Sequence, residues 1–180
     1  ITFDDGYADN LHNALPILQR YNAKATIYVV VDRHDRDRST YKKAHHNSGE
    51  LAREAKLTDD ELDALVVSGR IEIGSHTLTH CNLATTAEAD KHHELIESQA
   101  LLREQTGQPV MSFAYPFGIY GSDDVAMASK LGYTTAVTTV DGIDELQPVP
   151  NPLDLKRIKI SGKDNVLAFV MRMRGGRRGW

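Results

Sequence analysis

The stretch Thr2-Phe3-Asp4-Asp5-Gly6 opens the chain, and the stretch Ser75-His76-Thr77-Leu78-Thr79-His80 follows further along it. Together they supply two adjacent carboxylates and two histidines four residues apart. A catalytic zinc site takes three protein ligands from histidine and carboxylate and leaves one position open for water. A spare carboxylate beside such a site can accept a proton from that water. The two stretches therefore predict the site of a metal-dependent hydrolase.

Short apolar runs of strand length alternate with helical patterns along the rest of the chain. Strands are expected at 1–3, 25–31, 71–74, 111–115, 134–139 and 155–160, and helices at 10–20, 58–67, 85–107, 123–131 and 164–173. Capping-box patterns, Thr58 with Glu61 and Thr85 with Glu88, mark the starts of two of these helices. The alternation predicts an α/β fold with a parallel sheet and helices outside it, either a barrel or an open doubly wound sheet.

The candidate site residues follow the ends of different expected strands. Asp4 and Asp5 follow the first strand. His76 and His80 follow the third, and the turn at residues 115–118 follows the fourth. Active sites of parallel α/β folds gather at the carboxyl ends of the strands, so we expect these groups to converge. Adjacent aspartates on an extended strand point in opposite directions and should have different roles. The two histidines would point the same way on one helical turn.

Length and composition narrow the possible classes of protein. The chain has 180 residues, of which 41% are hydrophobic and 26% charged, and this suits a single domain over 1–180. The formal net charge of −4 provides no basic field for nucleic acid. No apolar run reaches the ~20 residues of a membrane span. The single cysteine, Cys81, excludes an intrachain disulfide.

Several segments depart from the regular pattern. Residues 32–56 are irregular and too long for a simple connection, so we expect an insertion, a lid or a mobile loop. Residues 172–180 form a basic tail, expected to be solvated or disordered, with contact to an anionic polymer or membrane surface as the alternative. Residues 91–94, which include Glu94, are expected to form a solvated helix face. The chain begins at Ile1 without Met, so we expect a truncated N-terminus, from which an export signal could have been removed.

The two motifs resemble those of the polysaccharide deacetylases, the NodB-homology domain of carbohydrate esterase family 4. Residues 2–6 match the family's first motif, Thr-Phe-Asp-Asp-Gly, and residues 76–80 match the second, His-Ser/Thr-x-x-His. The resemblance runs from Ile1 to about Ile160. It implies a distorted (β/α) barrel with fewer than eight strands, and hydrolysis of an N- or O-acetyl group on a sugar polymer. An acetylated polysaccharide is therefore the expected partner.

The resemblance also implies a role for each residue of these two motifs. Asp4 would be the general base. Asp5, His76 and His80 would hold Zn²⁺ or another divalent ion such as Co²⁺ or Ni²⁺, which would polarise the substrate carbonyl.

The third motif region would contribute further groups. The backbone N–H of Phe117 would stabilise the oxyanion. The other residues of the same turn, Tyr115, Pro116 and Gly118, together with Arg157, are the expected substrate-binding residues.

Two departures from the family pattern affect these roles. Ala114 stands where the family's third motif has an arginine that pairs with the catalytic base. Arg157 is the well-placed arginine further along the chain, and we expect it to replace that partner. No histidine follows His93, so the family's general-acid histidine is not visible. His45 or His46 of the irregular segment is the hypothesised replacement.

The sequence favours one substrate class and leaves others open. The form Ala-Tyr-Pro-Phe-Gly at 114–118, with Leu-Lys-Arg-Ile at 155–158, resembles the branch containing deacetylases of exported poly-N-acetylglucosamine. The leading hypothesis is removal of N-acetyl groups from such a polymer, in an extracellular or cell-envelope (periplasmic) location. An O-acetyl esterase on a xylan-type glycan is the nearest alternative, because an alkoxide leaves with less help from an acid than an amine. A non-catalytic glycan-binding domain, which the intact Asp4 disfavours, and a small-molecule amide hydrolase also stay open.

Overall fold

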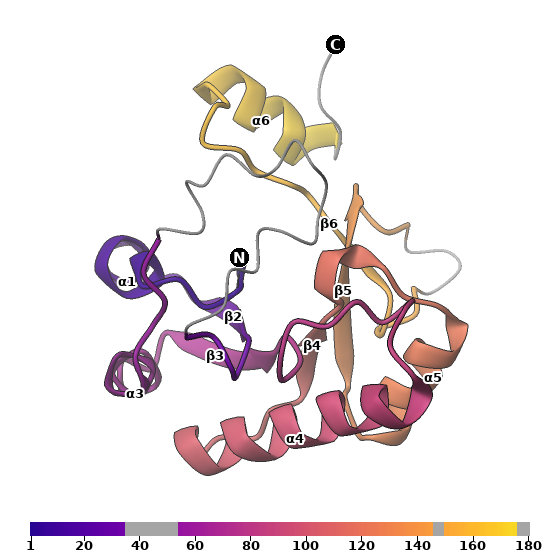
Figure 1. Ribbon diagram of the computed structural model, residues 1–180. Coiled ribbons are helices and arrows are strands. Elements are labelled where there is room, and N and C mark those ends of the chain that lie inside the picture. Colours follow the sequence, from indigo (N-terminus) through magenta and orange to yellow (C-terminus); the bar gives the residue numbers. More distant parts are fainter. Residues whose placement is uncertain (35–53, 146–149, 176–180) are drawn as a thin grey trace.

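The computed structural model describes residues 1–34, 54–145 and 150–175 of the chain. These residues form one sheet of six strands, which lie in the order β1-β2-β3-β4-β5-β6 and pair in parallel (Figure 1). The strands are β1 (Thr2–Asp4), β2 (Ala25–Val29), β3 (Ile71–Ser75), β4 (Ser112–Ala114), β5 (Thr135–Asp141) and β6 (Leu155–Arg157). Doubly wound sheets reverse their strand order at a switch point. Here the spatial order follows the chain order throughout, so the sheet is barrel-like.

The helices lie outside a sheet that curls into part of a barrel (Figure 1). They are η1 (Asn10–Ala14), α1 (Leu15–Arg20), α3 (Asp59–Val67), α4 (Glu88–Thr106), η3 (Pro116–Gly118), α5 (Ser122–Lys130) and α6 (Val166–Gly175). Each helix expected from the sequence is present, with its ends slightly shifted. The distorted (β/α) barrel with fewer than eight strands is confirmed for the described residues.

One of the two expected capping boxes forms and the other does not. At the start of α3, the Glu61 N–H donates to Thr58 Oγ1 at 3.2 Å, and the Thr58 N–H donates to the Glu61 carboxylate at 2.8 Å. The capping box expected at Thr85 is wrong, because α4 has Ala87 at its N-cap without a side-chain cap. The Thr85 hydroxyl donates instead to the Asn82 carbonyl at 3.2 Å. A turn begun by an asparagine therefore takes the hydroxyl before the helix starts.

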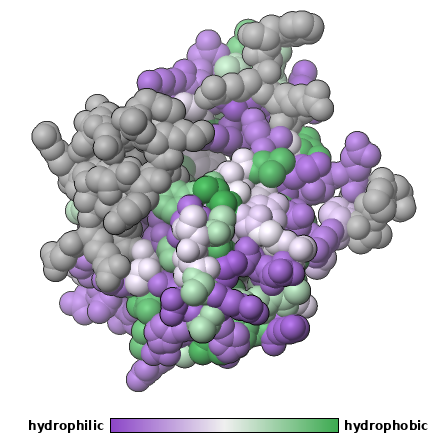
Figure 2. Space-filling view, turned by 45° about the vertical axis from the view of Figure 1, so that its right-hand side comes forward, coloured by the Kyte–Doolittle hydropathy of each residue, from purple (hydrophilic) through white to green (hydrophobic). Residues whose placement is uncertain are grey.

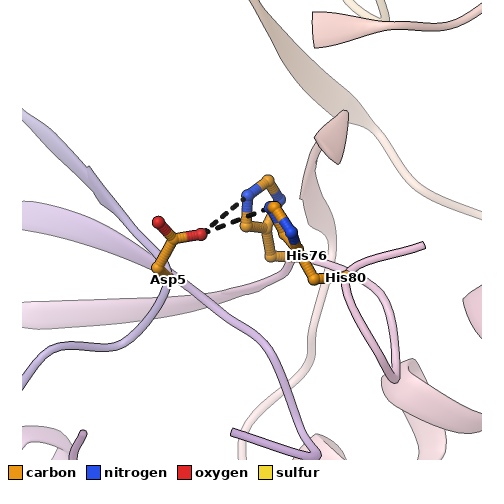
Figure 3. Close-up of side chains that lie close together, drawn as sticks. All are labelled: Asp5, His76 and His80. Atoms are coloured by element: carbon orange, nitrogen blue, oxygen red, sulfur yellow. Dashed lines mark ion pairs between the residues drawn. The ribbon is translucent and has the colours of Figure 1, made fainter. Parts of the chain in front are cut away.

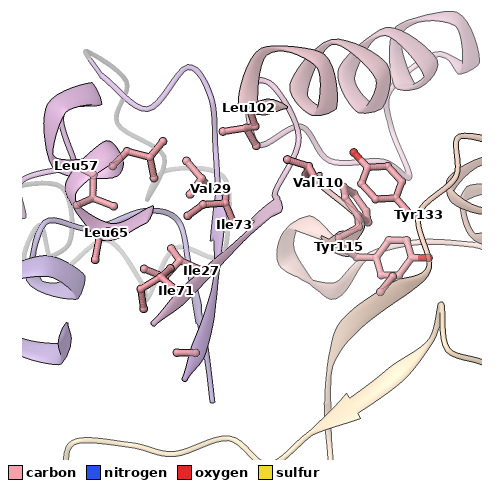
Figure 4. Packing of buried hydrophobic residues seen from close by; sticks show 14 of the residues in the cluster. Ile27, Val29, Leu57, Leu65, Ile71, Ile73, Leu102, Val110, Tyr115 and Tyr133 are labelled. Atoms are coloured by element: carbon pink, nitrogen blue, oxygen red, sulfur yellow. The ribbon is translucent and has the colours of Figure 1, made fainter. Parts of the chain in front are cut away.

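The main hydrophobic core includes buried residues of the sheet and of helices α1, α3, α4 and α5, and Figure 4 shows part of it. Ile27 and Val29 of β2 and Ile73 of β3 are fully buried there. Each side chain of this size contributes roughly 1.5–3 kcal/mol when it is completely removed from water. This packing holds the carboxyl ends of the central strands in place, and those ends position the candidate site.

Of the irregular segment, residues 32–56, the structure describes only the two ends, 32–34 and 54–56. The buried Arg33 donates from Nε to the Leu57 carbonyl at 2.5 Å, so the first end of the segment contacts the chain directly after the second. Residues 35–53 lie outside the described residues. The hypotheses of a lid and of a general acid at His45 or His46 therefore stay predictions.

The basic end of the chain differs in part from the expected solvated tail. Arg172 lies in α6 and is 2% exposed. Its guanidinium donates to the Lys159 carbonyl at 2.6 Å and to the Asp164 carboxylate at 3.0 Å. The expectation of a solvated side chain is wrong for Arg172, because these two acceptors bind its guanidinium in a buried position. Residues 176–180 lie outside the described residues.

The surface of the described part is mixed in polarity. On the face drawn in Figure 2, hydrophilic residues dominate and hydrophobic residues form small groups. Within the described ranges, no helix has the length and apolar character needed to cross a bilayer.

Candidate metal and catalytic site

Asp5, His76 and His80 meet at the carboxyl ends of β1 and β3 (Figure 3). Oδ1 of Asp5 lies 3.4 Å from Nε2 of His76 and 3.4 Å from Nε2 of His80. The three candidate ligand atoms all lie within 4.8 Å of one another. Both histidines are buried, whereas the Asp5 side chain keeps some contact with solvent. The fold thus brings together the three residues that the sequence suggested as metal ligands.

This donor set fits a divalent metal. Zinc bonds of about 2.0–2.2 Å in a tetrahedral site put neighbouring donor atoms roughly 3.3–3.6 Å apart. Both separations between the Asp5 carboxylate and the imidazole nitrogens, 3.4 Å, lie in that range. Three protein donors also leave a fourth position for water, as in catalytic rather than structural zinc sites.

A backbone carbonyl sets the orientation of the His76 ring. Nδ1 of His76 lies 2.7 Å from the carbonyl oxygen of Ala114, at the end of β4. A carbonyl oxygen only accepts, so Nδ1 donates to it whether the ring is neutral or protonated. In the neutral ring, the form that binds a metal, Nε2 faces Asp5 and presents its lone pair. Sequence reasoning missed this contact because any residue at position 114 would supply the same carbonyl.

The loop between the two histidines is irregular rather than helical. Thr77 and His80 have φ values of 67° and 58°. The condition that His76 and His80 share a helical turn is therefore not met, although both still face Asp5. Non-glycine residues in this region cost of order 1–3 kcal/mol each and persist where surrounding contacts hold them. Thr79 makes such contacts, because its N–H and its hydroxyl both donate to the Glu94 carboxylate, at 2.8 Å and 2.5 Å.

Glu94 is another residue near the site that sequence reasoning missed. Its neighbours His92 and His93 are exposed, as expected for a solvated helix face. Glu94 itself is 8% exposed and points at the loop. The expectation of a solvated face is wrong for Glu94, because this part of α4 packs against the loop that carries His80.

Asp4 has a partner different from those of Asp5. Arg157 donates from Nη1 to Oδ1 of Asp4 at 2.7 Å and from Nη2 to Oδ2 at 2.8 Å. The expected contact between Arg157 and Asp4 is confirmed. Arg157 also donates to the Thr138 carbonyl at 2.8 Å and to Thr2 Oγ1 at 3.2 Å. These bonds fix the guanidinium, and its contact with substrate stays a prediction.

The surrounding charges favour the ionised form of both aspartates. Burial opposes ionisation of Asp4, but the hydrogen bond from Arg157 and the charges of His76 and Arg157 outweigh it, so the pKa of Asp4 lies below its usual range. Burial also opposes ionisation of Asp5. The nearby His76 and His80 more than offset it and hold the pKa of Asp5 well below its usual range. Asp4 is therefore a carboxylate at neutral pH, the form that can accept a proton.

The turn η3 lies directly against His80. The ring of Phe117 packs edge-on to the His80 ring, with centroids 4.4 Å apart. Gly118 has φ of +65°, and a Cβ at that position would lie 1.9 Å from Thr139 Oγ1, so glycine is required there. The expected convergence of the turn with the histidines is confirmed. The oxyanion role of the Phe117 N–H and the substrate contacts of Pro116 and Gly118 stay predictions.

Tyr115 belongs to the core rather than to the surface of the site. Its side chain is 1% exposed, and its hydroxyl donates to the Leu153 carbonyl at 2.9 Å. One face of its ring stacks on Tyr120 at a centroid distance of 4.2 Å. Only the backbone of Tyr115 therefore remains a candidate for contact with a substrate.

The family of the chain follows from comparison with known proteins. The family model for polysaccharide deacetylases matches residues 1–136. The chain belongs to the polysaccharide deacetylase family. YxkH of Bacillus subtilis, which carries the family's name, is 32% identical over 142 residues, covering 79% of this chain and 44% of that protein. The chitooligosaccharide deacetylase of a Bradyrhizobium species is 27% identical over 150 residues, covering 82% of this chain and 58% of that protein.

Solved structures of deacetylases share this fold. The Streptococcus pyogenes deacetylase PplD, solved with acetate, aligns with a TM-score of 0.70 and 29% identity over 88% of this chain and 62% of that one. A polysaccharide deacetylase from Bacillus cereus aligns with a TM-score of 0.74 and 30% identity over 94% of this chain and 49% of that one. The chain thus spans between 44% and 62% of the lengths of these four relatives.

This member of the polysaccharide deacetylase family differs from the expected family pattern in the origin of its arginine. Ala114, which stands at the usual arginine position, is fully buried beside Tyr28 and Val137. The arginine that contacts Asp4 comes from β6 instead. An arginine therefore still binds the Asp4 carboxylate, but this arginine lies on β6 and not at position 114 on β4.

Cys81, directly after His80, is poorly suited to join the donor set. Burial, and after it the negative charge of Glu94, raise the pKa of the Cys81 thiol to about 12. The thiolate is the form that binds metals and acts as a nucleophile. Asp5, His76 and His80 therefore remain the candidate ligands in this part of the chain.

Proposed function

We propose that this chain is a metal-dependent hydrolase that removes N-acetyl groups from an N-acetylglucosamine-containing polysaccharide. One observation carries the proposal: a carboxylate held by arginine, Asp4, lies beside the Asp5–His76–His80 donor set. A site that only bound a metal would need no second carboxylate held in this way. Two imidazoles and a carboxylate suit Zn²⁺, and Co²⁺ or Ni²⁺ could take its place.

The residues of the site divide the proposed reaction between them. A bound divalent ion lowers the pKa of water and polarises the acetyl carbonyl. Asp4 accepts the proton of the attacking water at a carboxylate oxygen, while Arg157 holds both of its oxygens. The Phe117 N–H donates to the carbonyl oxygen as negative charge develops there. The C–N bond breaks, the amine leaves with a proton from an acid outside this set, and acetate and an amino sugar result.

The proposed substrate draws its support from relatives. The Bradyrhizobium relative is named a chitooligosaccharide deacetylase, and chitooligosaccharides are chains of N-acetylglucosamine. The similarity to IcaB of Ammonifex degensii, at 19% identity and a TM-score of 0.72, supports the fold alone. An extracellular or cell-envelope location is part of the same proposal, because such polymers lie outside the cytoplasm.

An O-acetyl esterase on a xylan-type glycan is the second candidate function. The observation that favours it is that residues 94–180 contain no histidine. An amine leaving group needs a proton donor, and these residues offer no histidine for that role. An alkoxide leaves more readily, so an ester substrate would tolerate that loss better.

Acetate release from N-acetylglucosamine oligomers tests the proposal. Chelator-treated protein, zinc-reloaded protein and zinc-reloaded Asp4→Asn are compared, with the exposed Asp63→Asn as the matched control. We expect release that requires zinc, is lost in Asp4→Asn and is kept in Asp63→Asn. Release from acetylated xylan alone would favour the esterase. Glycan binding by zinc-loaded protein without release from either substrate would overturn both and leave a binding domain.

A further inference from the structure

Helix α4 holds the histidine loop, residues 76–80, at both of its ends. The Thr79 N–H donates to Oε2 of Glu94 at 2.8 Å, and the Thr79 hydroxyl donates to Oε1 at 2.5 Å. One turn further along α4, Ser98 Oγ lies 2.8 Å from Ser75 Oγ, just before the loop. Glu94 and Ser98 stand at i and i+4, so they project from one face of the helix. The loop is therefore held against a rigid element rather than only by its own backbone.

The contact between Glu94 and Thr79 acts at the position where the loop needs support. Thr79 directly precedes His80, whose φ is 58°. Both donors of Thr79 are taken by the same carboxylate, so the peptide leading into His80 is fixed relative to α4. Glu94 is 8% exposed, so water has little access to replace it. Losing this carboxylate would leave the Thr79 N–H without that acceptor and release the backbone before His80.

We propose that Glu94 is a positioning residue that holds His80, through Thr79, in the orientation in which its Nε2 meets Asp5. The inference rests on the proposed metal-dependent function and concerns the affinity of that same site for its metal ion. Glu94 contacts neither metal nor substrate in this role. It acts as outer partners of metal ligands do, by fixing a ligand before the metal arrives.

Zinc affinity, measured by competition with a chromophoric chelator, is the main readout, and the absorption spectrum of the Co²⁺-loaded protein is the second. Glu94→Ala is expected to weaken zinc binding about 10- to 100-fold, the range for loss of an outer partner. Thr79→Val keeps the N–H donor and loses the hydroxyl, so a smaller loss is expected. Thr79→Ser keeps both donors and should bind like the wild type, as should Glu104→Ala, an exposed control on the same helix. The Co²⁺ spectrum should change in Glu94→Ala and Thr79→Val only.

A purely structural contact would give a different pattern. Glu94→Ala and Thr79→Val would then melt at lower temperature, with zinc affinity and Co²⁺ spectrum as in the wild type, and that result would overturn the inference. If Glu94→Ala does not fold, Glu94→Gln is judged by the same two readouts. A wild-type chain that binds no zinc would overturn the metal site itself, together with this inference. The wild-type measurement therefore distinguishes failure of the proposed function from failure of the role of Glu94.

Discussion

The Arg157 guanidinium donates a hydrogen bond to each carboxylate oxygen of Asp4, at 2.7 Å and 2.8 Å, although the two residues lie on the two outermost strands of the sheet. β1 and β6 are not neighbours in that sheet. Contact between them requires the sheet to curl until its edges face each other. A bidentate arginine–carboxylate pair is a strong, directional interaction. The pair thus links the edges of the partial barrel and also holds the carboxylate proposed as the general base.

Replacing Arg157 is expected to lower the rate of acetate release while leaving zinc bound. Alanine removes both hydrogen bonds to Asp4, and we expect kcat to fall about 10²-fold, the lower end of the range for general acid–base catalysis. Lysine restores a charge but not two parallel bonds, so Arg157→Lys should fall between alanine and wild type. Steady-state kinetics of zinc-loaded variants measure this, with the exposed Arg20→Ala as control. Wild-type kcat in Arg157→Ala would contradict the role of the pair.

Zinc is expected to stabilise the wild-type fold and to stabilise His80→Ala much less. A ligand present at 100 times its Kd adds about 2.7 kcal/mol to the free energy of unfolding when it binds only the folded state. Removing one of three donors should abolish most of this gain. Thermal melts with and without zinc measure it. His92→Ala, at an exposed histidine on α4, is the control and should keep the full zinc effect. Equal stabilisation of His80→Ala would argue against His80 as a ligand.

Gly118→Ala is expected to destabilise the chain more than Gly107→Ala. The two glycines have nearly the same φ, +65° and +63°, so alanine meets similar backbone strain at both. A Cβ at Gly118 would lie 1.9 Å from Thr139 Oγ1, whereas nothing lies within 4 Å of one at Gly107. We expect about 1 kcal/mol lost at Gly107 and at least about 1 kcal/mol more at Gly118 from overpacking. Chemical denaturation measures the difference, and equal losses would show that the η3 turn adjusts freely.

The pairing of Asp59 with Arg33 is expected to make stability depend on pH. Burial opposes ionisation of Asp59, but the hydrogen bond and charge of Arg33 outweigh it, so the pKa of Asp59 lies below its usual range. A pKa lowered by folding adds stability above the unfolded-state value, about 3.9. That stability is lost as pH falls through the folded-state pKa.

The stability of Asp59→Asn should therefore lie furthest below that of the wild type near neutral pH. The difference in the free energy of unfolding should shrink as pH falls below about 4. Asp60→Asn removes an exposed acid from the same helix turn and serves as the control. Urea denaturation at a series of pH values measures the difference. A gap for Asp59→Asn that stays constant with pH would contradict the assignment.

The strands and helices, and the trio of metal-type residues, could be predicted from the sequence. Alternating apolar runs and helical periodicities depend on residues close together in the chain, so each element could be assigned locally. Parallel strands then bring their carboxyl ends to one edge. Asp5, His76 and His80 follow two such ends, and their meeting required no knowledge of the packing.

Local patterns failed where the same residues had two ways to satisfy their hydrogen bonds. The hydroxyl of Thr85 could cap α4 or close a turn, and the Asn82 carbonyl took it. His76 and His80 could share a helical turn or an irregular loop. Hydrogen bonds to groups outside the loop stabilise the irregular conformation. The Ala114 carbonyl accepts from His76 at one end, and the Glu94 carboxylate accepts from Thr79 near the other.

The sequence by itself thus determined the kinds of element, their order and the residues that could bind a metal. Only the tertiary structure decided which arginine holds Asp4 and which acid supports the histidine loop. Arg157 was a candidate by its type, but its contact with Asp4 depends on how far the sheet curls. Glu94 directly follows four polar residues, 90–93, in sequence, and its burial depends on which face of α4 meets the loop. Curvature and helix rotation arise from the packing of the whole core, and no local pattern of residues encodes them.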